Sequence, residues 1–253
     1  MAEDTLSFAQ TPEYEPLPGL PIIFEDESII LVNKPSGMLS QPGRQESDSV
    51  LTRVLQGRPQ ISGSALVHRL DMDTSGLLLL AKNRTAHRVL QQQFEHRLIG
   101  KRYLARLCAI PGALGGRIHL PLRVDIDDRP RQIVCTEHGK VATTIWHRCG
   151  SRTPNHVWLY PLTGRTHQLR VHLAHPEGLG IAIEGDRLYQ NHYLPVDGQG
   201  RPVEVSASRD GTLPESPAGV GQLKLHAQLL TFDHPQTGIR KSFQTTPLFD
   251  GIG

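Results

Sequence analysis

One stretch decides how this chain folds and where its chemistry lies: residues 65–81, Ala-Leu-Val-His-Arg-Leu-Asp-Met-Asp-Thr-Ser-Gly-Leu-Leu-Leu-Leu-Ala. A short apolar approach leads to Asp71, a Thr-Ser-Gly turn follows, and an apolar run with strand character comes next. The sequence therefore predicts a single carboxylate on a turn between two strands, with Arg69 two residues before it. Such a rigidly presented acid suits a nucleophile or a general base.

A second motif points to nucleic acid. Residues 164–172 are Gly-Arg-Thr-His-Gln-Leu-Arg-Val-His, with two arginines around an expected helix start. Taken alone, Asp71 is more simply a turn residue whose carboxylate caps its own backbone, and Asp73 on the same turn is a rival for any catalytic role. Arg69 is equally well explained as a surface cation. A carboxylate, cationic partners and a surface suited to polyanions nevertheless indicate chemistry performed on a nucleic acid.

Composition limits the class of protein. The chain has 253 residues and 28.0 kDa, with 38% hydrophobic and 21% charged residues, as expected for a soluble protein with a substantial core. No apolar run is long enough to span a membrane, and residues 1–20 lack the basic start and apolar stretch of a secretory signal. Three scattered cysteines favour a reducing cytoplasm and argue against a disulfide framework or a zinc site: Cys108, Cys135 and Cys149.

The net charge of +2 conceals an asymmetry. Seven of the 25 acidic residues precede residue 34, in a segment that contains no Lys or Arg. The other 18 acids are outnumbered by all 27 basic residues, so the balance from Lys34 onward is +9. A body of this sign attracts phosphates, although a solvated basic face without a ligand explains the charge equally well.

The predicted elements indicate an α+β fold with a largely antiparallel sheet, because strands outnumber helices and do not alternate with them. A hairpin is expected from residues 22–24 and 29–32, a helix capped by Ser49 and ending at Gly57, and a longer helix capped by Asn83 that runs through Leu98. Further strands are expected at 102–107, 141–147, 157–162, 228–233 and 241–245, and a short helix at 166–174. We expect a flexible acidic leader over 1–20, one catalytic domain over 21–253, and a long loop or insertion at 191–221.

Two other patterns in the sequence have a simple structural explanation as well as a functional one. Three histidines between His167 and His175 suggest zinc, but His167 and His172 would point to different sides of a helix, and no Glu or Cys ligand stands at the usual spacing. We therefore predict no metal. Tyr103 stands between two arginines in an expected strand. It is either a core aromatic or a ring on which a base stacks.

Together these motifs resemble the RluA family of pseudouridine synthases, from about Ile22 to the C-terminus. The matching segments are 32–37, 42–44, 68–71, 74–76, 101–103, 164–172, 185–189, 225–227 and 234–235. Segments 120–122, 129–132 and 134–135 resemble the single-domain branch that acts on large-subunit ribosomal RNA and a tRNA anticodon stem-loop. The chain departs from the family pattern at 180–184, where relatives have Gly-His-Pro-Ile, and in its long 191–221 segment.

The resemblance implies the pseudouridine synthase fold: a mixed, mainly antiparallel sheet with flanking helices and loops around a central catalytic cleft. It implies an isomerase that breaks the glycosidic C–N bond of a uridine, turns the uracil and forms a C–C bond, without a cofactor or a metal. Asp71 would be the catalytic carboxylate, Arg170 its ion-pair partner, and Tyr103 the ring that stacks on the uracil. The expected partner is a structured RNA stem-loop, and the expected enzyme is a cytoplasmic monomer.

The resemblance also assigns four binding residues. Arg69 would fill the gap that the displaced base leaves, Leu169 would pack under the base, and Arg165 and Lys34 would bind phosphates. Three alternatives remain open at this point. They are a synthase of another RluA branch with a different RNA target, a catalytically silent RNA-binding module, and a retaining glycoside hydrolase that uses Asp73 as its second carboxylate.

Overall fold

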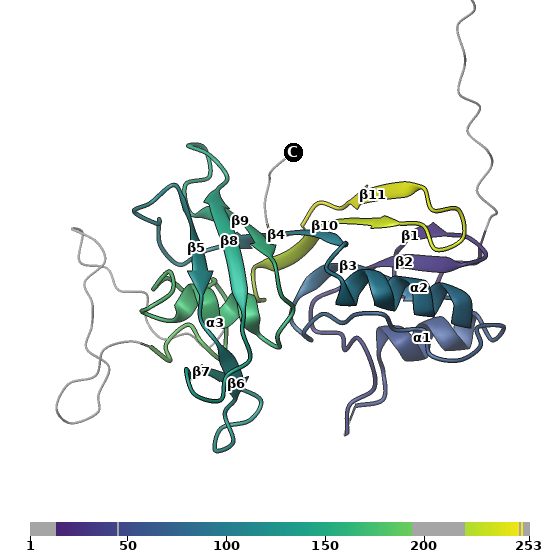
Figure 1. Cartoon of the computed structure of the whole chain (residues 1–253), viewed down its shortest axis with the longest axis horizontal. Coiled ribbons are helices and arrows are strands. Elements are labelled where there is room, and N and C mark those ends of the chain that lie inside the picture. The colour runs from purple at the N-terminus through teal and green to yellow at the C-terminus, as the bar shows by residue number, and fades with distance from the viewer. Residues whose placement is uncertain (1–13, 45, 194–220, 248, 250–253) are drawn as a thin grey trace, which may run out of the picture.

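A computed structural model describes residues 14–44, 46–193, 221–247 and 249, and its strands form one long sheet that crosses the molecule (Figure 1). The order along the sheet is β1-β2-β3-β10-β4-β9-β8-β5, and β11 pairs with β10. These strands are β1 (Ile22–Glu25), β2 (Ile29–Lys34), β3 (Ser75–Ala81), β4 (Gly100–Arg106), β5 (Gly115–His119), β8 (Thr143–Arg148), β9 (His156–Pro161), β10 (Leu225–Asp233) and β11 (Arg240–Gln244). A second, two-stranded sheet joins β6 (Leu122–Val124) to β7 (Gln132–Val134).

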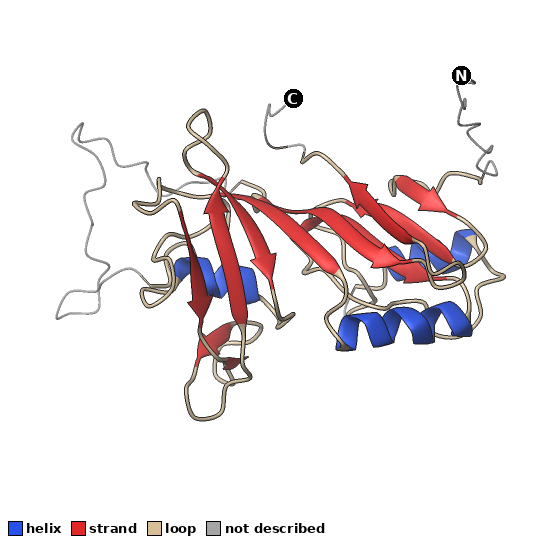
Figure 2. Cartoon of the chain, turned by 45° about the horizontal axis from the view of Figure 1, so that its top comes forward, coloured by secondary structure: helices blue, strands red, loops and turns tan. Residues whose placement is uncertain are grey.

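The predicted α+β class with a mainly antiparallel sheet is confirmed. Only the β3–β10 pair is parallel among the strand pairs of the described residues. Figure 2 shows that the strands run on from one half of the molecule to the other, and Figure 1 places β10 and β4 where the halves join. The first half holds α1 (Val50–Gly57) and α2 (Arg84–Glu95), and the second holds α3 (Gln168–Ala174).

The leucines of β3 point alternately to the two faces of the sheet, and each face of the first half is covered by a helix. Leu78 and Leu80 pack in one cluster with Val50 and Val54 of α1. Their strand neighbours Leu77 and Leu79 pack in another cluster, with Ala86 and Leu90 of α2. Because successive side chains of a strand point to opposite faces, a continuous run of leucines is what a strand buried on both faces requires.

The helix starts follow the predicted capping residues. The side chain of Ser49 accepts a hydrogen bond from the backbone N–H of Thr52, and that of Asn83 accepts one from Ala86. Two predicted helix boundaries are wrong: α2 ends at Glu95 instead of Leu98, and α3 begins at Gln168 instead of residue 166. The second difference has a local cause, because His167 adopts the left-handed conformation with φ 52° and cannot continue a helix backward. Strands β5, β6 and β7 were not predicted.

The end of the predicted leader is part of the folded body. Residues 1–13 lie outside the described residues, as do 194–220 of the predicted insertion. Leu17 and Leu20, however, are buried against α1 and the strands beside it, so the packed chain begins before residue 21.

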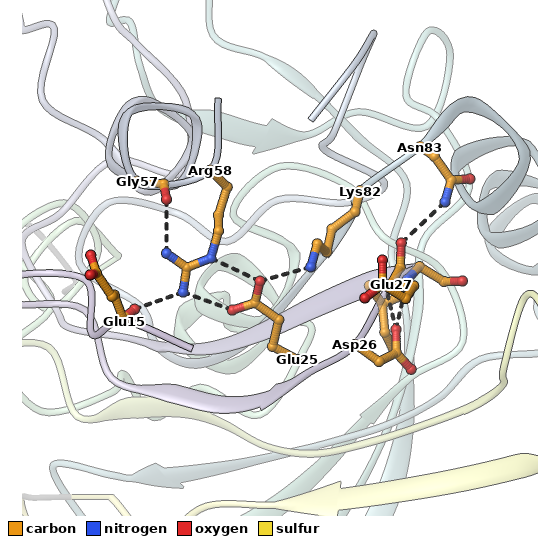
Figure 3. A network of polar contacts seen from close by, with 10 residues as sticks. Glu15, Glu25, Asp26, Glu27, Gly57, Arg58, Lys82 and Asn83 are labelled. Carbon is orange, nitrogen blue, oxygen red and sulfur yellow. Dashed lines mark hydrogen bonds and ion pairs between the residues drawn. The ribbon is translucent and has the colours of Figure 1, made fainter. Parts of the chain in front are cut away.

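A buried ionic network holds this segment in place (Figure 3). The guanidinium of Arg58 donates to both carboxylate oxygens of Glu25 at 2.9 Å and to the backbone carbonyl of Glu15 at 2.7 Å. Lys82 donates to the same Glu25 carboxylate at 2.9 Å. Because these charges are paired and hydrogen-bonded, their burial does not leave an isolated charge. None of the described helices is long and apolar enough to cross a membrane.

Candidate active site

A cavity of about 90 Å³ lies where the two halves of the sheet meet, and five of the seven predicted site residues line it. The turn before β3 contributes Arg69 and Asp71, β4 contributes Tyr103, and the β9–α3 connection and the start of α3 contribute Arg165 and Leu169. Lys34 and Arg170 are not among the lining residues. Neither is Asp73, so the structure separates the two acids that spacing alone did not distinguish.

Strand β10 brings Asp71 and Tyr103 together across a long stretch of sequence. Ala227 is the register partner of Gly76 on β3 and of Tyr103 on β4. Gly76 has φ 112°, and a Cβ at that position would lie 2.4 Å from the carbonyl oxygen of Ala227. Only glycine fits this close approach, because any side chain would push β3 away from β10 and its turn away from Tyr103.

The backbone of the Asp71 turn is held by the loop that follows β2. Ser40 Oγ donates to the carbonyl of Leu70 at 2.7 Å and accepts from the Leu70 N–H at 3.0 Å. Ser36 Oγ donates to the carbonyl of Asp73 at 2.6 Å. The Asp71 carboxylate itself has no hydrogen bond or ion pair with any other described residue. The turn is therefore fixed while its acid remains available for a substrate.

Lys34 belongs to this support, and its placement leaves no donor for the predicted phosphate contact. Its side chain is fully buried, and its ammonium donates to the carbonyls of Pro35 at 2.9 Å, Met38 at 2.7 Å and Met72 at 2.7 Å. All three donors are used. Burial lowers the pKa of Lys34 to about 7, although the charges of Asp73 and Asp71 oppose the shift.

The predicted ion pair between Arg170 and Asp71 is wrong. Arg170 donates from Nε at 2.8 Å and from a terminal nitrogen at 2.6 Å to the two carboxylate oxygens of Asp186. Both side chains are buried, and the described ion pairs include none between Arg170 and Asp71. Burial lowers the pKa of Arg170, but the hydrogen bond to Asp186 and the charges of Asp186 and Asp71 outweigh it and raise the pKa. Asp71 is thus near enough to act electrostatically on Arg170.

The cavity beside Asp71 is lined by an aromatic side chain and by two arginines. The aromatic side chain is Tyr103. Burial, and then the charge of Asp71, raise the pKa of its hydroxyl above the usual range, so the hydroxyl stays protonated. Arg69 is exposed, and its guanidinium donates to Thr166 Oγ1 at 3.0 Å. Arg165 donates from Nε to the carbonyl of Val141 at 3.2 Å. Each arginine keeps further N–H groups for a ligand.

Gln168 was missed as a functional residue, although it stands inside the quoted motif. Its amide oxygen accepts from Thr163 Oγ1 at 2.7 Å and from the backbone N–H of Arg165 at 3.0 Å. Its amide nitrogen donates to the Thr143 carbonyl at 3.0 Å and to Thr144 Oγ1 at 3.1 Å. All four bonding capacities are used inside the protein, so Gln168 shapes the loop that carries Arg165 and Leu169.

The histidines of the same motif make structural hydrogen bonds. His172 is fully buried, with Nδ1 bonded to Thr144 Oγ1 at 2.9 Å and Nε2 to the Leu120 carbonyl at 3.1 Å. His167 Nδ1 bonds the Tyr189 hydroxyl at 2.8 Å. No group of three potential metal ligands occurs in the part of the chain that the structure describes.

Comparisons with known proteins agree with this geometry. The profile of the family described as "RNA pseudouridylate synthase" matches residues 28–175. The chain is 40% identical to the "Dual-specificity RNA pseudouridine synthase RluA" of Escherichia coli (strain K12) over 231 residues, which cover 90% of this chain and 93% of that protein. It is 41% identical to the protein of that name from Vibrio vulnificus over 229 residues, 87% of this chain and 80% of the relative.

Solved structures support the same fold. "Human RNA Pseudouridylate Synthase Domain Containing 4" superposes with a TM-score of 0.67 at 24% identity, covering 90% of this chain and 89% of the human one. Fold and family together define the class of protein, an RNA-modifying isomerase. The chain belongs to the RluA family of RNA pseudouridine synthases.

Proposed function

We propose that the cavity beside Asp71 is the catalytic site and that it receives the target uridine after the base has left its stack. One observation carries this proposal: an uncommitted carboxylate on a rigid turn lines the same cavity as a half-buried tyrosine ring. A base inside an RNA stem or loop stack cannot present its glycosidic bond to a carboxylate, so the nucleotide must turn outward.

The roles of the lining residues follow from the reaction. The C1′–N1 bond breaks, the uracil rotates, and a C1′–C5 bond forms, while the proton on C5 is lost and N1 gains one. Asp71 is the carboxylate that acts on the nucleotide. The detached uracil must be retained while it rotates, and the ring of Tyr103 stacks on one face of it while Leu169 packs against it. Arg69, exposed at the edge of the cavity, occupies the gap left in the RNA, and Arg165 binds a phosphate.

We assign the substrates to large-subunit ribosomal RNA and a tRNA anticodon stem-loop. Support comes from the relatives described as dual-specificity RNA pseudouridine synthases, at 40% identity over 90% of this chain, and from the branch motifs at 120–122, 129–132 and 134–135. The three cysteines of the chain are free thiols, which fits a reducing cytoplasm as the place where the enzyme acts. We propose that it acts there as a monomer.

Mapping pseudouridines in RNA from a deletion strain tests this assignment. We expect one position in large-subunit ribosomal RNA and one in a tRNA anticodon loop to lose the modification and to regain it when the wild-type gene is restored. Loss at one of the two would reduce the assignment to a single substrate, and loss only at other positions would place the enzyme in a different branch. Nucleoside analysis of RNA treated with the purified enzyme should yield the C–C nucleoside and no free uracil, which excludes a glycosidase.

A further inference from the structure

Strand β4 places a second functional group in the cavity beside Tyr103. Lys101 precedes Tyr103 by two residues, and side chains at this spacing point to the same face of a strand. Both line the cavity, together with Arg69 and Arg165. The ammonium of Lys101 lies 4.0 Å from the place that a Cβ at Gly164 would occupy, so the absence of a side chain there keeps the space in front of it open.

Half-buried Lys101 differs from the fully buried cations of the described residues, because its ammonium has no partner among them. Lys34 donates to three carbonyls, and Arg170 and Arg58 bind carboxylates. No hydrogen bond or ion pair engages the ammonium of Lys101 anywhere in the described residues. Burial, and then the charge of Arg97, lower the pKa of Lys101, and no carboxylate offsets them.

Lys101 has nothing that compensates for its loss of hydration. A half-buried ammonium without a counter-charge loses hydration and gains no attraction in return. The charge of Arg97, an exposed residue in the turn between α2 and β4, adds to this cost. An anion bound to Lys101 would offset it, and the substrate carries one at every nucleotide.

We propose that Lys101 forms a subsite for an RNA phosphate adjacent to the uridine held in the Asp71 cavity. A nucleotide that turns out of its stack carries its flanking phosphates with it, so a phosphate contact at the cavity rim holds the turned-out strand in register. This inference rests on the proposed catalytic use of the cavity. It assigns to Lys101 a substrate contact that fixes the backbone, as distinct from the base contact of Tyr103.

RNA binding as a function of salt tests the subsite. Binding of a synthetic anticodon stem-loop RNA is measured in the Asp71→Asn background, where turnover does not interfere. Adding Lys101→Met should weaken binding and reduce the slope of log K against log salt by ~0.7, the value for one phosphate contact in a single strand. Lys101→Arg should restore both. Arg84→Met is the matched control: this exposed arginine lies at the far end of α2 and should leave the slope unchanged.

RNA in which one phosphate is replaced by a neutral group identifies the phosphate that Lys101 contacts. When methylphosphonate replaces the phosphate on either side of the target uridine, one of the two RNAs should bind the Lys101→Met protein as well as its parent does. An unchanged salt slope, or a full effect of Lys101→Met on both neutral RNAs, would overturn the subsite. A loss of turnover at unchanged RNA affinity would also overturn the subsite, because Lys101 would then act on the uracil and not on a phosphate. Full turnover by Asp71→Asn would instead overturn the proposed catalytic site.

Discussion

Two acidic turns stand close to each other in this protein, and they use their carboxylates in opposite ways. The Asp186 carboxylate binds two nitrogens of Arg170 and also accepts the backbone N–H groups of Leu188 at 3.0 Å and Tyr189 at 3.1 Å. The Asp71 carboxylate binds none of the described residues, while the carbonyls around it are held firmly. A carboxylate saturated with donors stabilises a fold, and one left open on a fixed backbone is available for reaction.

Replacing Asp71 tests the reactive side of this comparison and should give the largest effect. Asp71→Asn should reduce single-turnover pseudouridine formation by at least about a hundredfold, the lower end for loss of a catalytic proton-transfer group. The free energy of unfolding should change by no more than about 0.5 kcal/mol, because the carboxylate has no partner to lose. Product formation by rapid quench and urea denaturation measure the two quantities.

Asp73→Asn is the matched control, since it removes a second carboxylate from the same turn. Asp73 does not line the cavity, so its replacement should leave turnover within about threefold of wild type, well below the effect of losing a catalytic group. Equal losses in the two variants would contradict the choice of Asp71 over Asp73.

Replacing Asp186 tests the structural side. Asp186→Asn leaves the buried guanidinium of Arg170 without its counter-charge, and breaking a buried pair in this way costs about 3–5 kcal/mol. The midpoint of urea denaturation should fall accordingly, far more than for Asp71→Asn. Arg170→Ala should be destabilising for the same reason, and it should lose activity through the displaced start of α3.

Paired replacement measures how strongly Asp186 and Arg170 stabilise the fold as a pair. If Asp186 and Arg170 act as one structural pair, the double variant Asp186→Asn/Arg170→Met should be more stable than the sum of the two single changes predicts. Strict additivity of the two free energies would mean that the pair contributes nothing as a unit.

Turns and helix caps were predicted from the sequence more accurately than ion pairs between residues far apart in the chain. The hairpin at β1–β2 and the helix starts at Ser49 and Asn83 were predicted because turn residues and capping residues act over a few positions. The ion pair of Arg170 was misassigned, since its partner Asp186 is 16 residues away and only the folded loop brings them together. Spacing carries no information about such a pairing.

Lys34 is a second residue whose partner could not be predicted from the sequence around it. A lysine in a Lys-Pro-Ser-Gly loop resembles a phosphate contact, and nothing local indicates that Met72, 38 residues later, supplies a carbonyl to it. The residues that do line the cavity were predicted through family resemblance, not from periodicity. Strands β5, β6 and β7 were missed because they are short and mostly exposed or half-buried, so they lack an alternating apolar pattern.

Replacing Tyr103 should reduce turnover less than replacing Asp71 or Asp186 changes activity or stability. The reduction should concern the reaction beside Asp71 only. Tyr103→Ala should slow single turnover by about 5- to 150-fold, which corresponds to the ~1–3 kcal/mol that base stacking contributes in other RNA-binding sites. Tyr103→Phe keeps the ring and should remain near wild type. A similar loss in both variants would transfer the role from the ring to the hydroxyl, and wild-type rates in Tyr103→Ala would exclude stacking altogether.

The last test concerns the fixed backbone under Asp71, through the pH dependence that Lys34 gives to stability. Its pKa is about 7 in the folded protein and near the ordinary 10.5 in the unfolded chain. Between these values the unfolded chain holds a proton that the folded protein has released, so the free energy of unfolding rises with pH. The contribution is lowest below pH 7 and should increase by at most about 1.4 kcal/mol per pH unit above it. Lys34→Met should lack this increase, so the difference between wild type and variant, measured by urea denaturation at pH 7, 8 and 9, should widen in favour of wild type. A difference that stays constant with pH would mean that Lys34 remains charged throughout and that its three carbonyl partners outweigh its burial.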